Sequence, residues 1–340
     1  MRGRFASPAT LLTSGAVLLA AVLFASWTLR SDDFLYVPNE ARPVAGKVDV
    51  SDDAETAGDA TGGIYFIDVN VRKARWLEHV LPFLRPEGAS LVSGHAVTGP
   101  GQTFAEWRAQ ARVDMERSEQ IAAAVAFREA GLEVDATPRG ALIEAVAIDV
   151  PAAKTLRGGD VIVQAEGRPV RTPRALIAAM GAIAPGDAVR LRLRRSGKVL
   201  QRTVGTVAAP EDPERAIIGI QVSQEARIRL PRDVTIDLGD VGGASAGLPF
   251  ALEVYQQLGK DVDRGLRIAA TGEIQLDGAI APVGGIKQKT VGVRRSGADV
   301  FLVPAGENAT TARRYAGTLR IVPVESFRQA LRVLQTLPQK

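Results

Sequence analysis

Residues 233–258 read DVTIDLGDVGGASAGLPFALEVYQQL, which predicts a strand, a glycine-rich turn and a helix in that order. Apolar residues alternate from Val234 onward, as they do along a half-buried strand. They then recur at helical spacing from Leu248, and Gly259 supplies a stop signal. Ser245 stands between the glycines and the helix, where an N-cap residue is expected.

The Ser245 hydroxyl has two interpretations. A serine in front of a helix is commonly a capping residue whose hydroxyl accepts a backbone N–H. The small residues before it favour a second one, because exposed amides near Gly243 and Ala244 and the helix dipole can stabilise an oxyanion. Small residues also let a substrate backbone approach closely. In that case Ser245 is a nucleophile, and it needs a base.

Few residues can serve as that base. The chain has 340 residues, only two histidines (His79 and His95) and no cysteine. The absence of cysteine excludes disulfides, thiolate zinc sites, iron–sulfur clusters and a cysteine nucleophile. His79 lies in an amphipathic segment and His95 in a predicted loop, so a histidine-assisted hydrolase of small esters is the weaker hypothesis.

Lysine offers another base. A helix predicted to begin near Gly285 carries one stripe made by Ile286, Lys289, Thr290 and Val293. Lys287 falls off this stripe, so Lys289 is the lysine expected to face inward. A desolvated lysine prefers its neutral form, and a neutral amine can take a serine proton. By periodicity alone, a lysine snorkelling at the edge of an apolar face remains the favoured interpretation of Lys289.

Three ordered motifs resemble the proteolytic domain of Lon-type proteases. They are GASAG at 243–247, ATGEI at 270–274 and PVGGIKQK at 282–289. The motifs extend over about 50 residues, so the match is specific. The resemblance implies a fold of the α+β class.

The same resemblance implies a Ser-Lys dyad, with Ser245 as nucleophile and Lys289 as general base. It places the hydroxyl of Thr271 near the dyad, where it can orient the amine. Gly243 and Ala244 would support the site through their backbone. A proline often stands in this family where Ala244 stands here.

A second resemblance covers about 70 residues of short β-rich runs around one helix at 173–180. GALI at 140–143, GGDVI at 158–162 and GRPV at 167–170 resemble a PDZ domain of the bacterial type. Such domains bind an extended peptide as an added strand and hold its C-terminal carboxylate in backbone amides. The implied peptide-binding residues are Gly140, Ala141 and Leu142.

Residues 114–126 are similar to the helix that precedes the active-site half of Lon-type domains. We therefore expect the PDZ-like module to interrupt the protease domain, and the rival layout is three domains in series. The expected order is a cytoplasmic tail (1–8), a transmembrane helix (9–29), a linker with a short strand near 34–37 (30–62), the first part of the protease domain (63–131), the PDZ-like module (132–208) and the second part of the protease domain (209–340).

Residues 9–29, ATLLTSGAVLLAAVLFASWTL, carry no charge and at ~1.5 Å per residue span roughly 30 Å, the thickness of a bilayer core. Arg2 and Arg4 precede them, so the N-terminus is expected in the cytoplasm and the remainder outside it. A cleaved signal peptide is the alternative, although Leu23-Phe24-Ala25 has a large residue where cleavage needs a small one.

The sequence has no G-x-x-x-x-G-K-[ST] loop, so we expect no bound nucleotide. We also expect no other cofactor and no metal. The formal charge is +4, with Lys and Arg spread along the chain, and nucleic acid is not an expected partner. The combination of features resembles the membrane-anchored YlbL-like proteases. This implies ATP-independent cleavage of peptides or unfolded segments, with homo-oligomerisation left open. The alternative is a catalytically inactive, membrane-tethered PDZ scaffold that binds protein C-termini.

Overall fold

The computed structural model describes residues 17, 29–51, 62–98, 103–210, 212–237, 239 and 241–339. The predicted transmembrane helix at 9–29 lies outside these residues, except for Val17 and Leu29. Among the helices in the described ranges, none combines the length and apolar character that a bilayer crossing requires.

The larger domain, here the α/β domain, is built on a sheet with the order β2-β4-β16-β19-β20. Its strands are β2 (Arg42–Pro43), β4 (Gly63–Phe66), β16 (Arg267–Ala270), β19 (Val300–Pro304) and β20 (Arg320–Val324). The last four run parallel, and β2 pairs antiparallel at one edge. The α+β expectation is wrong for this domain, because crossover helices join its neighbouring parallel strands.

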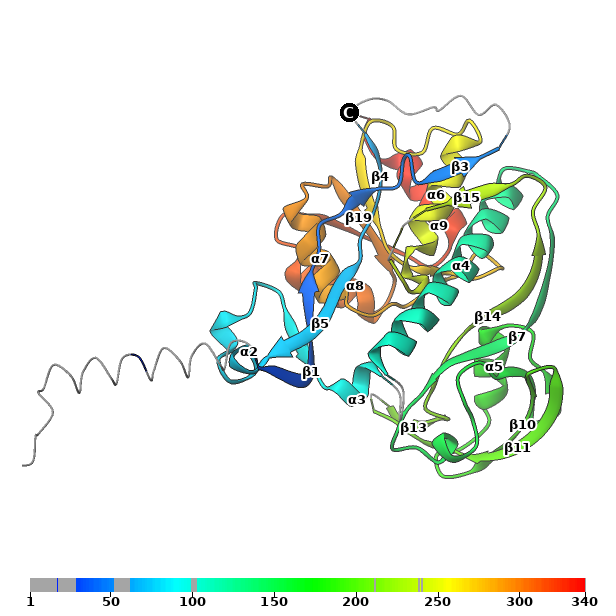
Figure 1. Ribbon diagram of the computed structural model, residues 1–340. Helices are drawn as coiled ribbons and strands as arrows, with labels where there is room; N and C mark the ends of the chain where they lie inside the picture. The colour runs from blue at the N-terminus through cyan, green and yellow to red at the C-terminus, as the bar shows by residue number, and fades with distance from the viewer. Residues whose placement is uncertain are drawn as a thin grey trace, which may run out of the picture.

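Helices cover both faces of this sheet (Figure 1). One core packs α4 (Phe104–Glu129), α6 (Gly247–Gln257) and α9 (Phe327–Thr336) against one face. A second core packs α7 (Ile286–Arg295) and α8 (Glu307–Tyr315) against the other. Strand β19 is consequently apolar and buried at every position.

Segments from both ends of the chain build the α/β domain. Strand β4 pairs with β16 in parallel, with Phe66 opposite Ala270. Helix α4 lies along α6, and both contribute to one hydrophobic core. The smaller domain lies between them in sequence, so the α/β core closes only when residues about 200 positions apart meet.

The smaller domain, here the β domain, has its own core and a sheet with the order β11-β10-β8-β7-β14. Its strands are β7 (Asp135–Val146), β8 (Val161–Ala165), β9 (Arg168–Pro169), β10 (Ala188–Arg195), β11 (Lys198–Gly205) and β14 (Ile220–Arg229). Helix α5 (Pro173–Met180) and the 3-10 turn η2 (Pro151–Lys154) cover it, and β12 (Val207–Ala209) pairs with β13 (Asp212–Ile217). Strand β14 lies beyond residue 208, where the PDZ-like module was predicted to end, and extends the sheet by pairing with β7.

The segment predicted as a linker is structured over residues 30–51. Strand β1 (Arg30–Pro38) lies between β5 (Val69–Arg75) and β6 (Ser90–Val92), and β3 (Val48–Val50) pairs with β15 (Val234–Ile236). Three short helical pieces accompany them: α2 (Trp76–Val80), η1 (Pro82–Leu84) and α3 (Gly94–Val97). The linker prediction fails at β3 because this strand is short and buries only Val48 and Val50. The polar residues around them hide the apolar alternation that would indicate a strand.

Candidate active site

The predicted catalytic residues meet where parallel strands end. Thr271 directly follows the last residue of β16, and Asp68 follows the end of β4. Helix α7 carries Lys289, and the 3-10 turn η3 (Ala244–Ala246) carries Ser245 just before α6. The carboxyl ends of parallel strands form the crevice in which α/β sheets bind their ligands.

Lys289 is buried, with 3% of its surface exposed. Removal from water lowers the pKa of its amine from 10.5 to about 7, because burial penalises the charged form. Asp68 acts in the opposite direction, but its carboxylate is already engaged by Arg42 at 3.1 Å and by the amide of Asn39 at 3.0 Å. The Lys289 amine is therefore available as a neutral base near neutral pH.

Thr271 connects the lysine to the serine segment. The Lys289 Nζ donates to Thr271 Oγ1 at 3.1 Å, and that hydroxyl donates to the Ser245 carbonyl at 3.1 Å. The Gly272 N–H donates to the same carbonyl at 2.9 Å. In its neutral form the amine donates one N–H to Thr271, and its lone pair can accept a hydrogen bond or a proton from another group. Thr271 is fully buried, which holds this arrangement rigid.

Ser245 is not the N-cap of α6. The turn η3 precedes the helix, α6 begins at Gly247, and neither element has a side-chain cap hydrogen bond. The sequence placed the helix start one residue too early, because the N-cap position of α6 belongs to Ala246 and not to Ser245. The capping interpretation of the Ser245 hydroxyl is therefore wrong, and that hydroxyl stays available for chemistry.

Helix α4 supports the serine turn from outside. Ser118 Oγ donates to the Ala244 carbonyl at 3.0 Å, and the Gly243 N–H donates to the Ala111 carbonyl at 2.7 Å. The second bond uses the Gly243 N–H, which the sequence analysis considered as a donor to an oxyanion. Gly243 instead supplies a turn with φ of 93°, a backbone conformation that favours glycine.

Close packing also explains two further small residues near Ser245. A Cβ on Gly242 would lie 2.8 Å from the Cβ of Ala111. A Cβ on Gly247 would lie 2.8 Å from Ser118 Oγ and 2.9 Å from a methyl group of Ile274. Glycine is required at both positions so that α4 can approach the turn, independently of any substrate.

The two lysines of α7 have different environments. Lys287 is half-buried, and its Nζ donates to Ser90 Oγ at 3.2 Å and lies 5.6 Å from the centre of the Tyr315 ring. It therefore fastens the loop before β6 to the helix, whereas Lys289 points into the domain. The inward orientation predicted for Lys289 by helical periodicity matches its burial, and its role as a base stays a prediction.

The histidines lie elsewhere in the chain. His79 belongs to α2, where its Nδ1 lies 2.9 Å from an Asp33 carboxylate oxygen. His95 belongs to α3 and not to the loop that the sequence predicted. In the described ranges, no group of three or more His, Cys, Asp and Glu side chains could hold a metal ion.

The peptide-binding residues predicted in the β domain are wrong. Ala141 and Leu142 lie on β7, which pairs with β8 on one side and with β14 on the other. Gly140 is paired with Glu225 of β14 as well. Both edges of β7 are therefore filled by this chain, and an added peptide strand cannot pair there. The pairing of β7 with β14 was not foreseen, because the PDZ-like module was predicted to end at residue 208, before β14 begins.

Strand β14 is the edge strand of that sheet. It follows Ile217-Ile218-Gly219, an apolar segment with a glycine at φ of 76°, which is a signal that sequence inspection passed over. Helix α5 lies against the same part of the sheet. An edge strand beside a helix is the arrangement that peptide addition to a sheet requires.

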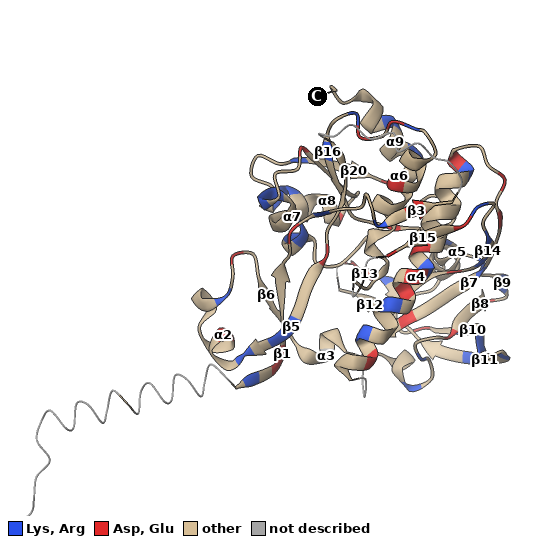
Figure 2. Ribbon diagram, turned by 45° about the horizontal axis from the view of Figure 1, so that its top comes forward, with Lys and Arg blue, Asp and Glu red and all other residues tan. Residues whose placement is uncertain are grey.

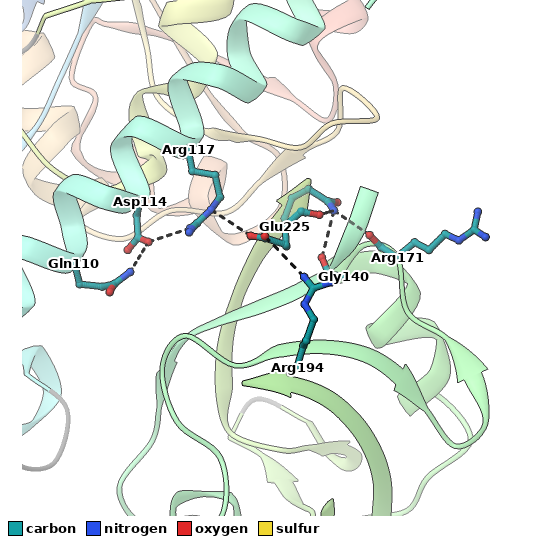
Figure 3. Close-up of polar contacts among 8 residues, drawn as sticks. Gln110, Asp114, Arg117, Gly140, Arg171, Arg194 and Glu225 are labelled. Carbon is teal, nitrogen blue, oxygen red and sulfur yellow. Dashed lines mark hydrogen bonds and ion pairs between the residues drawn. The ribbon is translucent and has the colours of Figure 1, made fainter. Parts of the chain in front are cut away.

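Helix α4 joins the two domains through charged side chains (Figure 3). Arg117 lies 3.2 Å from Asp114 and 3.8 Å from Glu225 of β14, which in turn lies 4.0 Å from Arg194. Burial, together with the charges of Glu144 and Asp114, raises the pKa of Glu273 to about 8. Burial also raises the pKa of Glu144 and of Asp114. We call this group, Asp114, Arg117, Glu144, Glu225 and Glu273, the junction cluster.

Comparison with known families agrees with this geometry. The family described as "PDZ domain" matches residues 113–206, and "Lon protease (S16) C-terminal proteolytic domain" matches residues 228–336. Two successive parts of the chain thus match a PDZ domain and the proteolytic domain of Lon proteases. The PDZ match begins inside α4, whose buried residues nevertheless pack in the core of the Lon-type domain.

Curated relatives point to the same Lon-type domain. The chain is 30% identical to Lon protease 2 of Bacillus subtilis over 108 residues, 32% of this chain and 18% of that protein. It is 35% identical to Lon protease of Methanosarcina barkeri over 115 residues, 32% of this chain and 14% of that protein. The chain thus spans less than a fifth of the length of these relatives.

Among solved structures, the PDZ domain of an SdrC-like protein from Listeria monocytogenes is 26% identical to this chain. The match covers 25% of this chain and 87% of that one, with a TM-score of 0.23. The resemblances to both families that the sequence motifs indicated are confirmed by the family matches.

Proposed function

We propose that this chain is an ATP-independent, membrane-anchored serine endopeptidase that cleaves peptides and unfolded or exposed protein segments outside the cytoplasm. One observation carries the catalytic part of the proposal. The amine of Lys289 is buried, is held by Thr271 and lies in the same hydrogen-bonded unit as the backbone of Ser245.

Catalysis begins with neutral Lys289. Its lone pair takes the proton of the Ser245 hydroxyl as Ser245 Oγ attacks the scissile carbonyl. The resulting ammonium then gives that proton to the leaving amine, and an acyl-enzyme remains on Ser245. Water, deprotonated by the same amine, releases the acyl group and restores the serine. Thr271 keeps the amine oriented throughout, because it accepts one N–H of the lysine.

The oxyanion is held by backbone amides at the start of η3. The first amides of a helical turn have no partner inside the helix. The Gly243 amide is committed to Ala111, so Ala244 and Ser245 are the donors that we assign. Donors that are fixed before the reaction are worth about 3 kcal/mol each in related chemistry.

The cellular setting rests on sequence features. The uncharged stretch 9–29, preceded by Arg2 and Arg4, supports an N-terminal anchor with the catalytic domain outside the cytoplasm. The lack of a phosphate-binding G-x-x-x-x-G-K-[ST] loop supports action without nucleotide. An enzyme without an unfolding engine needs substrates that already expose an extended segment.

Substrate recruitment falls to the PDZ domain. Its open edge is β14, so we assign peptide docking to that strand in place of Gly140, Ala141 and Leu142. Strand β14 also carries Glu225, which contacts Arg117 of the Lon-type domain. A peptide on β14 therefore binds close to the connection between the two domains.

The test is cleavage of an unfolded protein by the full chain in detergent, without nucleotide. Ser245→Ala and Lys289→Met should each abolish turnover, whereas Lys287→Met, on the same helix, should retain it. New N-termini in the products identify the cleaved bonds. Turnover that survives in Ser245→Ala would exclude the proposed nucleophile. An inactive wild-type chain that still binds peptides at β14 would support the tethered scaffold.

A further inference from the structure

An exposed apolar surface lies at the other end of the molecule from the PDZ domain. In α2 and the following turn η1, Phe83 is 78% exposed, Val80 48% and Trp76 46%. Trp76 and Val80 are four residues apart on α2, a spacing that brings two side chains to one side of a helix. Phe83 follows in η1, which begins directly after Leu81, the C-cap residue of α2. Large apolar side chains that gather on a small surface mark an interaction site.

The other large apolar side chains exposed in the described ranges are dispersed. Val17 lies in the stretch 9–29, and the rest are spread over separate places: Val113 on α4, Ile148 after β7, Ile177 on α5 and Val199 on β11. Single exposed side chains of this kind need no partner. By contrast, five such side chains are exposed on α2, on η1 and at Leu29, whose carbonyl accepts the backbone N–H of Trp76. We call them the α2 face, which consists of Leu29, Trp76, Val80, Phe83 and Leu84.

The α2 face is held rigidly from behind. Glu78, buried beneath it, accepts two hydrogen bonds from Arg72, at 2.8 and 2.6 Å, and one from the backbone N–H of Arg75 at 2.8 Å. These bonds lower the pKa of Glu78, so it stays ionised. Arg85 closes the other end by donating to the Glu78 carbonyl at 2.7 Å. The apolar side chains are therefore presented by a fixed scaffold.

The position of this face in the chain indicates what covers it. The backbone N–H of Trp76 donates to the carbonyl of Leu29 at 2.9 Å. Leu29 is the last residue of the uncharged stretch 9–29, and β1 begins at the next residue. Figure 1 shows α2 beside the start of β1. The apolar face therefore lies directly at the point where the proposed anchor ends.

Two cationic side chains lie on the strands that contact α2. Arg30 is exposed on β1 and Lys73 on β5, and both strands pass beside α2 (Figure 2). The contact of Lys73 with Asp32 is long, at 3.9 Å, and leaves its ammonium in solvent. An aromatic and aliphatic surface with Lys and Arg at its margin fits the headgroup region of a bilayer with anionic lipids.

We propose that the α2 face rests in the headgroup region of the membrane that residues 9–29 cross, an inference that rests on the proposed anchor. Trp76, Val80 and Phe83 enter the boundary between headgroups and acyl chains, and Arg30 and Lys73 contact lipid phosphates. Five side chains cover much less than the ~1,200 Å² that a stable protein interface buries. They suffice for a lipid contact, because the anchor already supplies a high effective concentration.

The contact fixes the orientation of the protease on the membrane. The chain after η1 leads to Glu87, which bonds Arg294 at 2.6 Å and Arg295 at 2.8 Å on α7, the helix of Lys289. The catalytic helix is therefore coupled to the α2 face by one short loop. A second contact besides the anchor prevents the domain from rotating freely, so the active site stays at a defined height above the bilayer.

The three tryptophans of the chain make the test direct, since Trp27 lies in the proposed anchor, Trp76 on the α2 face and Trp107 on α4. Three full-length variants each keep one tryptophan and carry phenylalanine at the other two positions. Each is reconstituted in vesicles of phosphatidylethanolamine and phosphatidylglycerol, with and without brominated acyl chains. Brominated lipids should reduce the emission of Trp27 and Trp76 by about twofold or more and leave Trp107 unchanged.

Two further measurements separate the outcomes. Val80→Glu with Phe83→Glu, introduced into the Trp76-only chain, should restore Trp76 emission in brominated vesicles and leave the quenching of Trp27 intact. Quenching of Trp27 without quenching of Trp76 overturns the α2 face and leaves the anchor standing. Absence of both overturns both proposals. A Trp76 protected from iodide but not quenched by lipid indicates a second copy or another protein on this face, and overturns the lipid contact.

Discussion

The Lys289 pocket and the junction cluster use the same physical effect on opposite charges. In the pocket, one amine is buried and its one nearby carboxylate, Asp68, is already shared with Arg42. In the junction cluster, carboxylates outnumber the single Arg117. Loss of solvent lowers the pKa of the lysine to about 7 and raises that of Glu273 to about 8.

The comparison teaches that burial without a matched counter-ion produces groups that change charge near neutral pH. The pocket thereby holds an amine whose pKa is about 7, and the junction holds one carboxyl group, that of Glu273, whose pKa is about 8. The two regions adjoin, because Glu273 is two residues from Thr271 along the chain. A change of charge at the junction therefore occurs next to the residue that orients Lys289.

The largest expected effect comes from removing the buried amine. Lys289→Met keeps the length and apolar character of the side chain but cannot accept a proton, so kcat/KM should fall by about 10³-fold or more. Lys287→Met is the matched control on the same helix and should stay within about threefold of wild type. Initial rates on an unfolded substrate measure both. Equal losses in the two variants would remove the distinction between the two lysines.

The same substitution should make the folded state more stable. The folded pKa of Lys289, about 7, lies below its ordinary value of 10.5, so the unfolded chain binds a proton that the folded chain does not. This penalty is absent above pH ~10.5, grows as pH falls and is complete below pH ~7. Lys289→Met should therefore gain up to about 4 kcal/mol at neutral pH and nothing at high pH. Denaturant midpoints at several pH values check this, and a gain that does not depend on pH would contradict it.

Activity itself should follow the same ionisation. Because only neutral Lys289 can accept the Ser245 proton, kcat/KM should rise with pH through an apparent pKa near 7, the value of this amine. Thr271→Val removes the hydroxyl but keeps the shape, and should reduce kcat about 10- to 100-fold with little change in KM. The wild-type profile and the variant kinetics test the two statements separately. An unaltered kcat in Thr271→Val would leave the amine oriented by packing alone.

The junction should respond in the opposite direction to pH. The pKa of Glu273 is raised from 4.5 to about 8, so the folded state binds the extra proton and stability falls as pH rises through this window. Glu273→Gln should remove this loss, and its advantage over wild type should grow between pH ~5 and ~8. Arg117→Gln should cost about 1–3 kcal/mol, because it removes the charged partner that Asp114 and Glu225 share. Thermal unfolding across pH compares the two variants.

The smallest effect is expected at an exposed pair. Glu166 accepts from Arg190 at 2.8 Å on the surface of the PDZ domain. Water screens this pair, so Arg190→Ala should leave the denaturant midpoint unchanged within measurement error at any pH. A large effect there would show that ion pairs matter in this protein irrespective of burial, and the contrast between pocket and junction would lose its basis.

Sequence inspection predicted the burial of single helical residues better than the pairing of distant strands. Helical spacing placed Lys289 inward and Lys287 outward, since burial on a helix follows a local repeat. The peptide-binding residues failed, because the strand pairing of β7 with β14 is set about 80 residues away. The short strand predicted near 34–37 lies within β1, whereas β3 was missed for a similar reason, because it acquires its partner only in β15.

The sequence by itself determined which residues the proposed chemistry uses: a serine after small residues, a threonine and an inward lysine, each in a short local motif. Only the tertiary structure decided how these groups are supported. It commits the Gly243 amide to Ala111, gives both edges of β7 to its own chain and brings Thr271 against Lys289. The physical reason is range. Periodicity records which side of an element is buried, whereas a hydrogen bond between distant segments leaves no repeat in either one.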